Sequence, residues 1–443
     1  MRTVKNNIHD TEEIVDALTA KIKPLESAED LDPLMEYIGD AQYVLLGEAS
    51  HGTHEYYTWR AKITQRLIQE KGFSFVAVEG DWPDCYTVNR YAKGYAEAGK
   101  DTKSVLHEFN RWPTWMWANW EMAAFIDWLK QHNDKLEQNK KVGFYGLDVY
   151  SFSDSMQSII AYLQKNDQEA LTLAYKVMEC FEPYGKDEGQ SYARASAFVP
   201  ELCEKEVTKL LAEVHRKMPG YNTDHENVMS TEQNVYIARD AEQYYRAMIK
   251  NGPKSWNIRD THMVGTLDRL MKFHGENAKT VVWEHNTHIG DARATDMAHD
   301  GMVNVGQLVR EQYNKKGVVA VGFGSYKGSV IAGNHWGGAM KRLTVPDAIE
   351  GSWEHAFHIA SHGQNKLLLL EDIKDEDILS NYIGHRAIGV VYHPEHEQYG
   401  NYVPTILPKR YDAFIFLDTT TALHPLHIHP DGHKVPDTYP FGM

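Results

Sequence analysis

Ionisable side chains follow several apolar runs of the sequence, each at the point where a run ends. Neutral imidazole can take a proton from water near pH 7, and a carboxylate that accepts its other ring N–H fixes the tautomer. His51 therefore fits the role of a general base, with Glu48 or Glu79 as the orienting carboxylate. His51 could instead cap the following helix or bind backbone in its turn. The side chains expected to share one cavity are those of Glu48, His51, Glu79, Asp148, His285 and His288.

Two arginines lie close to these run ends. Arg60 is within about two helical turns of the start of the helix expected after residue 52. It could hold a carboxylate or stabilise an oxyanion, or it could form a surface ion pair with Glu55. Arg259 stands between Asn257 and Asp260, where we expect a helix to open, and capping is the expected role of those two side chains.

Tryptophan is concentrated in residues 111–120, which hold four Trp. Such a segment is either buried core at a helix start or a loop that covers a cleft and forms a wall for a large apolar ligand. The sequence predicts catalytic roles for His51, Glu48, Glu79, Arg60 and His285, and substrate-binding roles for His288, Asp148, Trp82, Trp115, Trp117 and Arg259.

A divalent metal site is the main alternative for the same cluster, because imidazole and carboxylate are ligands that zinc accepts. Its ligands would be Glu48, His51, Glu79 and His285, but no HExxH motif occurs. Histidines also recur near the C-terminus in an alternation that resembles a metal box, although a solvated tail is favoured there. These are His424, His427, His429 and His433.

Other catalytic and cofactor motifs are absent from the sequence. It has no GxSxG elbow, and Ser50 beside His51 is poorly placed as a nucleophile. Neither a GxGxxG fingerprint after a strand nor a P-loop occurs, which argues against dinucleotide and nucleoside triphosphate binding. We expect no cofactor.

The apolar runs and helical patterns around these residues predict an α/β fold. Residues 53–71 have one apolar face and end at Gly72, which predicts a helix between two strands. Strand, helix and strand within about forty residues make a parallel βαβ unit. We expect a three-layer core with a mainly parallel sheet. Strands are predicted at 43–46, 73–78, 142–147, 280–283, 318–323, 367–370, 388–392 and 413–417.

The distribution of strand-like apolar runs also predicts how the chain is divided into subdomains. Residues 151–278 lack strand-like runs and contain amphipathic helices at 201–217, 231–250 and 259–273, which indicates a helical insertion subdomain. The expected divisions are 1–150 and 279–423 for the two parts of the α/β core, 151–278 for the insertion, and 424–443 for an irregular tail.

Composition restricts the classes of partner. The 46 Lys and Arg against 62 Asp and Glu give a net charge of −16 over 443 residues, without a basic run that could neutralise phosphates. Nucleic acid and membrane surfaces are therefore not expected partners, and no apolar stretch of 18 residues is present. The N-terminus does not read as a signal peptide, so a cytoplasmic protein is expected. Cys85, Cys180 and Cys203 have no CxxC spacing and predict neither a disulfide framework nor a zinc site.

Together these motifs resemble the erythromycin esterase family. The resemblance runs from about residue 40 to about 425 in the family's order. It is carried by residues 47–52, 78–81, 115–117, 146–148, 259–260, 284–288, 386–392 and 410–413.

The resemblance implies that a water activated by a histidine hydrolyses a macrolide lactone without a metal, as in antibiotic resistance. That histidine is His51, with Glu48 and Glu79 around it, and with Arg60, His285 and His288 completing the pocket. The expected partner is a small-molecule ester or lactone. The resemblance also implies a fold related to a haem-binding lipoprotein group, so a noncatalytic haem- or metal-binding protein is the alternative.

Overall fold

Side chains that alternate along the strands supply two apolar cores on opposite faces of one sheet. In the strand Tyr43–Leu46, Val44 and Leu46 enter one core, whereas Tyr43 and Leu45 enter the other. Both faces of a parallel sheet are covered by helices, which explains why its strands read as continuous apolar runs. The three-layer α/β architecture expected from the sequence is therefore confirmed in this computed structural model.

The structure describes residues 8–184, 190–196, 198, 202–221, 224–248, 252–313, 317–374 and 376–427. Its strands are β1 (Lys23–Pro24), β2 (Tyr43–Leu46), β3 (Phe75–Asp81), β4 (Gly143–Asp148), β5 (Thr280–Trp283), β6 (Val318–Ala332), β7 (Lys341–Val345), β8 (Lys366–Leu369), β9 (Ile383–Arg386), β10 (Tyr402–Thr405) and β11 (Ala413–Thr420).

The helices are α1 (Ile8–Thr19), α2 (Asp32–Ile38), α3 (His54–Lys71), α4 (Trp82–Ala92), α5 (Thr102–Leu106), α6 (Trp120–Asn133), α7 (Phe152–Asn166), α8 (Gln168–Phe181), α9 (Gln190–Ser196), α10 (Glu204–Lys217), α11 (His225–Met248), α12 (Lys254–His274), α13 (Asn286–Ile289), α14 (Val305–Tyr313), α15 (Trp353–Ser361), α16 (Glu397–Gly400) and α17 (Leu407–Arg410). Gly72 ends α3 with a φ of 69°, a left-handed conformation that glycine adopts without strain.

The large sheet has the strand order β1-β8-β11-β6-β2-β5-β3-β4, with β7 paired to β6. Every pair from β11 to β4 in this order is parallel, whereas β1, β8 and β7 pair antiparallel. The five strands β6, β2, β5, β3 and β4 are consecutive neighbours. Their carboxyl ends therefore open at one edge of the sheet.

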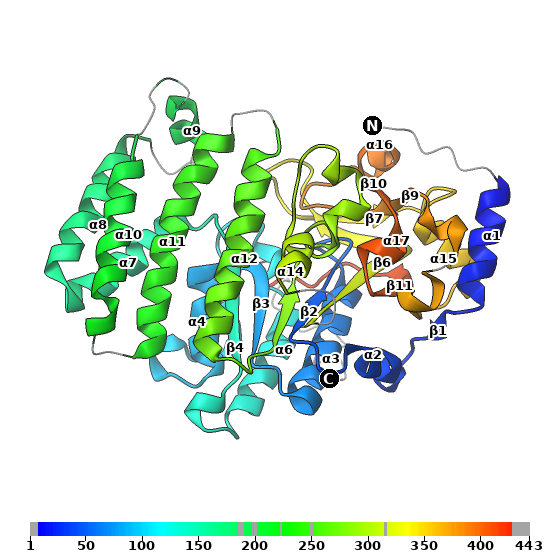
Figure 1. The fold of residues 1–443 in the computed structure, drawn as a ribbon, viewed down its shortest axis with the longest axis horizontal. Coiled ribbons are helices and arrows are strands. Elements are labelled where there is room, and N and C mark those ends of the chain that lie inside the picture. Colours follow the sequence, from blue (N-terminus) through cyan, green and yellow to red (C-terminus); the bar gives the residue numbers. More distant parts are fainter. Residues whose placement is uncertain are drawn as a thin grey trace.

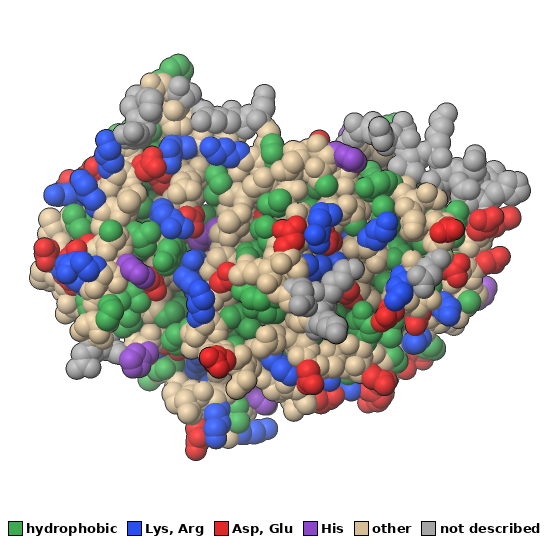
Figure 2. Space-filling model, viewed as in Figure 1, with side chains coloured by type: hydrophobic (Ala, Val, Ile, Leu, Met, Phe, Trp, Pro, Cys, Tyr) green, Lys and Arg blue, Asp and Glu red, His purple; other side chains and the backbone are tan. Residues whose placement is uncertain are grey.

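Two groups of helices cover this sheet. Apolar residues of α2, α3 and α6 fill the core on one face, and those of α1, α12, α14 and α15 fill the core on the other. Helices α7, α8, α10 and α11 stand side by side at one end of the molecule, on the left in Figure 1, and share an apolar core of their own. On the face shown in Figure 2, acidic and basic side chains are interspersed. No helix among the described residues is long and apolar enough to cross a membrane.

The structure corrects three expectations about local structure. Residues 388–392 form no strand but only isolated bridges, at Ile388 to Ser50 and at Val391 to Gly333. Cys180 and Cys203 form a disulfide that links the end of α8 to the start of α10, a pairing that sequence spacing does not reveal. Finally, His424 is packed against Glu121 instead of lying in a solvated tail, and residues 428–443, with His429 and His433, are outside the described residues.

Candidate active site

The five neighbouring strand ends open into a cavity of about 450 Å³. It lies where ligands bind in open parallel sheets, beyond the carboxyl ends of the strands. Seven of the predicted site residues line it together, and Glu48 and Arg60 lie directly behind one of them, His51. The seven are His51, Glu79, Asp148, His285, His288, Arg259 and, in the aromatic wall, Trp117.

Two glycines allow the first loop of the site to pack closely. A Cβ on Gly47 would lie 2.1 Å from Oδ1 of Asn286, and a Cβ on Gly52 would lie 1.9 Å from the carbonyl oxygen of Ile331. Asn286 uses this space to bond the backbone of Phe323 with both ends of its amide. The loops after β2 and β5 are thereby locked to β6, which fixes the histidines they carry.

His51, Glu48 and Arg60 form a hydrogen-bonded chain. Nδ1 of His51 lies 2.9 Å from Oε1 of Glu48, and Nη2 of Arg60 donates to Oε2 of Glu48 at 2.6 Å. Because a carboxylate only accepts, Nδ1 carries the proton and Nε2 keeps its lone pair. His51 lines the cavity, so this lone pair is the available base. The geometry does not support a helix-capping role for His51, because no side-chain cap bond is formed at the start of α3.

Arg60 is a buried positioning group. Its side chain is 0% exposed, and its guanidinium lies 4.4 Å from the ring centre of Tyr57 and 4.9 Å from that of Trp283. The surface ion pair with Glu55 considered above is therefore excluded. Nε and Nη1 of Arg60 have no hydrogen-bond partner in the described part of the chain, so its charge depends on Glu48. Arg60 does not itself line the cavity.

His285 presents a hydrogen-bond donor beside His51. The two rings have centroids 4.9 Å apart. The Thr287 backbone N–H donates to Nδ1 of His285 at 3.3 Å, which leaves the proton of the neutral ring on Nε2. Burial, assisted by the nearby His51, holds the pKa of His285 well below its usual range, so the ring stays neutral. Nε2 is buried near the Ala49 carbonyl and has no hydrogen-bond partner among the residues that the structure describes.

Glu79, Arg259 and Asp148 form the charged floor of the cavity. Nη2 of Arg259 donates to Oε1 of Glu79 at 2.7 Å and to Oδ2 of Asp148 at 2.6 Å, and Nε of Arg259 donates to Asp148 at 3.0 Å. The backbone N–H of His285 donates to the other oxygen of Glu79 at 2.9 Å. Burial favours the neutral acid, but His288 and His51 in their protonated forms, together with the charge of Arg259, outweigh it and hold the pKa of Glu79 well below its usual value.

A second histidine and carboxylate pair borders the same cavity. Nδ1 of His288 lies 2.9 Å from Oδ2 of Asp260, and the indole of Trp256 stacks on the His288 ring at 4.6 Å. Nη1 of Arg259 lies 3.0 Å from Nε2 of His288. A guanidinium only donates, so in the neutral ring Nε2 of His288 is the acceptor there and is less available as a base than Nε2 of His51. Burial lowers the pKa of His288, but the charges of Asp260 and Glu79 outweigh it and raise the pKa, which favours the imidazolium form.

The expectation that Asn257 and Asp260 cap a helix is wrong, because α12 begins earlier, at Lys254. Asp260 is fully buried within the helix and also accepts from the Val305 backbone N–H at 3.1 Å. Its role in holding His288 was missed by sequence reasoning. No local sequence signal indicates this role, because only the fold brings Asp260 to His288, 28 residues away.

Aromatic side chains form the wall and mouth of the cavity. Trp117 lines it and donates to the carbonyl oxygen of Glu79 at 3.1 Å, and Trp112 packs against Trp336 with ring centroids 4.7 Å apart. Two predicted substrate-binding residues lie elsewhere. Trp115 is buried beneath Trp112, and Trp82 is buried against Tyr145 with its indole N–H bonded to Ser230. Both fill the apolar core. For Trp115, this is the alternative given above for the tryptophan-rich segment 111–120.

An acidic corner was not predicted from the sequence. Nε and Nη2 of Arg111 donate hydrogen bonds to the two carboxylate oxygens of Asp81, at 2.5 and 2.7 Å. Asp84 lines the cavity beside this pair. Burial, with the charge of Asp81 nearby, raises the pKa of Asp84 to about 7. Tertiary burial causes this shift, and no local sequence signal indicates it.

The donors of the catalytic cluster do not form a metal-ligand set. Both oxygens of Glu48 are bound by His51 and Arg60, and Glu79 is paired with a guanidinium. In the residues that the structure describes, the group of three donors close enough to hold an ion is a different one, His54, Glu121 and His424, which lies outside the cavity.

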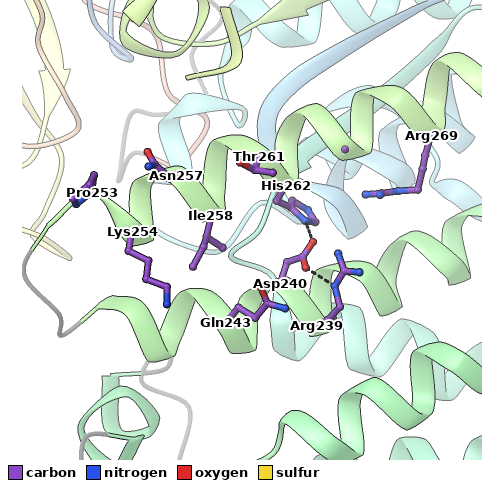
Figure 3. Close-up of a pocket in the computed structure, with 11 residues that line it drawn as sticks. Arg239, Asp240, Gln243, Pro253, Lys254, Asn257, Ile258, Thr261, His262 and Arg269 are labelled. Atoms are coloured by element: carbon purple, nitrogen blue, oxygen red, sulfur yellow. Dashed lines mark hydrogen bonds and ion pairs between the residues drawn. The ribbon is translucent and has the colours of Figure 1, made fainter. Parts of the chain in front are cut away.

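Two further cavities lie near the site. One, of about 800 Å³, is lined by aromatic residues of the α7 and α8 region and shares Arg111 and Tyr150 with the catalytic cavity. The other, of about 550 Å³, lies between α11 and α12 (Figure 3). There Nδ1 of His262 lies 2.7 Å from Asp240, but the His262 side chain is 0% exposed and its Nε2 lies 3.4 Å from the Thr266 hydroxyl, so it presents no open base to this cavity. The cavity at the strand ends is therefore the candidate active site.

Comparison with known proteins identifies one matching family for the chain. The family model described as erythromycin esterase matches residues 68–420. A protein named erythromycin esterase type II, from Escherichia coli, is 23% identical over 358 residues, which cover 75% of this chain and 82% of that protein.

Solved structures share the fold. A succinoglycan biosynthesis protein has a TM-score of 0.74 at 21% identity, over 94% of this chain and 99% of the other. A Bacillus cereus protein has a TM-score of 0.75 at 22% identity, over 95% and 99% of the two chains. A mutant of the erythromycin esterase EreC in its open conformation has a TM-score of 0.64 at 15% identity, over 90% and 97%.

Proposed function

Because the chain belongs to the erythromycin esterase family, we propose that it hydrolyses carboxylic esters or lactones with a water activated by His51. The observation that carries the proposal is the chain from Arg60 through Glu48 to His51, which ends in an imidazole on the cavity wall. A histidine oriented by a buried carboxylate is the arrangement that general base catalysis requires. No activity has to be assigned to Ser50, whose hydroxyl contacts Thr53 and not a histidine.

The proposed reaction starts with proton transfer from water to Nε2 of His51. The water oxygen forms a bond to the carbonyl carbon of the ester, and the carbonyl π electrons move to oxygen. Glu48 stabilises the imidazolium that results, as Arg60 holds Glu48 in place. When the tetrahedral intermediate collapses, the C–O bond to the alcohol breaks and the imidazolium returns its proton to the leaving alkoxide. Water is the only co-reactant.

His285 suits the role of oxyanion donor in this reaction. Its ring lies beside that of His51, stays neutral and has its proton on a buried Nε2. A donor fixed before reaction in a site shielded from water stabilises developing charge without reorganisation. The charged floor of Glu79, Arg259 and Asp148 is internally paired, so we assign it to positioning and to binding polar groups of the substrate.

The shape of the site favours a large substrate with apolar parts. The cavity is walled by tryptophans, and the neighbouring cavity of about 800 Å³ shares Arg111 and Tyr150 with it as lining residues. We propose that the ester group reacts next to His51 and that a bulky remainder extends over Tyr150 toward Tyr175 on α8. A macrolide lactone is one substrate of this kind, and a role in antibiotic resistance would follow from its hydrolysis.

Activity on a panel of substrates tests the proposal. Purified protein would be incubated with small aryl esters, simple lactones and a macrolide lactone, in buffer with and without a strong chelator. Hydrolysis that survives the chelator and disappears in His51→Ala supports the proposal. A metal-dependent hydrolase would lose activity to the chelator, and a noncatalytic haem-binding protein would hydrolyse none of these substrates and show a Soret band.

A further inference from the structure

Three side chains outside the catalytic cavity bring ligand atoms to one point. Nδ1 of His54 and Nδ1 of His424 each lie 2.7 Å from Oε1 of Glu121, and the rings of the two histidines have centroids 5.4 Å apart. The three ligand atoms lie within 4.8 Å of one another. None of the three residues lines the cavity that contains His51.

Rigid elements hold this group together. His54 is the first residue of α3 and Glu121 lies in the first turn of α6. The segment that carries His424 is bound to both helices through backbone: the His54 N–H donates to the Thr421 carbonyl at 2.9 Å, and the Trp120 N–H donates to the His424 carbonyl at 3.0 Å. Ligands fixed by their scaffold bind an ion with little ordering cost.

The charges around His54, Glu121 and His424 favour a bound cation. The side chain of Glu121 is 0% exposed, whereas those of His54 and His424 are 16% and 39% exposed. Both imidazoles contact the same oxygen of this buried carboxylate. Glu55 adds negative charge near His54, which Lys62 partly offsets. A buried carboxylate faced by two imidazoles is stabilised by a proton or by a metal cation.

We propose that His54, Glu121 and His424 bind a divalent transition-metal ion such as zinc, which fastens residues 421–427 to the first turns of α3 and α6. Two imidazole nitrogens and one carboxylate oxygen are the donors that zinc accepts, and water can complete a four-coordinate site. The exposed side of His424 provides the entry path. This site also accounts for the first histidine of the alternating C-terminal motif. It is separate from the proposed hydrolysis, which uses no metal.

Zinc binding by the full chain tests this site. The purified protein would be stripped with a chelator, dialysed and titrated with zinc by calorimetry, with cobalt as a spectroscopic probe of coordination. We expect one ion per chain and a higher Tm with zinc. Glu121→Gln should weaken zinc binding at least about tenfold and abolish the rise in Tm, because losing even a supporting group of a metal site has an effect of that size.

Two further variants, His424→Gln and the control His215→Gln, separate loss of the zinc site from loss of folding. His424→Gln changes a partly exposed ligand and should lose zinc affinity without loss of folding, even if Glu121→Gln folds poorly. His215→Gln is the matched control, since His215 is an exposed histidine bonded to the single carboxylate of Glu232 at 2.7 Å, and it should bind zinc like wild type. Wild-type zinc affinity in folded His424→Gln and Glu121→Gln, or zinc lost in His51→Ala alone, would overturn the proposal. Ester turnover is not a readout here, so each proposal can fail independently.

Discussion

Glu48→Gln removes the charge that joins Arg60 to His51 while keeping the shape of the side chain. Glu48 is buried and binds both partners, at 2.6 and 2.9 Å, and the other guanidinium nitrogens of Arg60 have no partner among the described residues. Breaking a buried ion pair from one side leaves an uncompensated charge, so the free energy of unfolding should fall by about 3–5 kcal/mol. Neutralising the carboxylate that orients a catalytic histidine should lower kcat by roughly 10²–10⁴-fold.

The same variant should change the pH dependence. The imidazolium of His51 loses the carboxylate that stabilises it, so the rising limb of kcat/KM should move to lower pH while its plateau falls. The limb reports the coupled cluster and not one residue. Steady-state kinetics on a reactive ester from pH 5 to 9 would be combined with urea unfolding.

Glu213→Gln is the matched control, because Glu213 pairs with Arg216 on the surface and its loss should leave both measurements nearly unchanged. A folded Glu48→Gln enzyme with the wild-type limb and plateau would refute the role assigned to Glu48.

Three further predictions concern other parts of the site. Asp260→Asn should lower kcat/KM by a smaller factor than Glu48→Gln, because it loosens His288 and not the base; a larger loss would make His288 the base. Asp84→Asn should raise the free energy of unfolding relative to wild type above pH 7, by up to roughly 4 kcal/mol, and leave it unchanged near pH 4. The folded pKa of about 7 lies above the ordinary aspartate value of 3.8, so wild type loses this stability as pH rises between the two values. Equal denaturant curves of the two proteins at pH 8 would contradict this. Tyr175→Ala should raise KM for a macrolide lactone but not for a small aryl ester, and equal effects on both would place the bulky group elsewhere.

The strands and the chemical cluster could be predicted because their signals are local. The strands Tyr43–Leu46 and Thr280–Trp283 coincide with their apolar runs, and polar residues at the ends of parallel strands must share an edge once the strands are neighbours. The sequence also indicated the helix that carries Arg60, but not whether this arginine faces Glu48 or solvent. That choice depends on Tyr57 and Trp283, which only the fold brings together.

The remaining features depend on tertiary contacts. Trp82 and Trp115 look like ligand-binding aromatics in the sequence, yet both pack into the apolar core. Strands β9 and β10 contain Gly384, His385 and Pro404 and form a separate two-stranded sheet, so no apolar run marks them. The proposed domain boundaries and the cytoplasmic location stay predictions.

Turnover measured in chelator, for wild type and for His51→Ala, tests directly whether His51 activates water without a metal. Wild-type and variant proteins would be assayed on the best ester or lactone of the panel, at a temperature where circular dichroism shows both to be folded. We expect wild type to keep its full rate in chelator and His51→Ala to lose at least about 10²-fold in kcat. Wild-type turnover by folded His51→Ala, or loss of wild-type activity in chelator without unfolding, would contradict it.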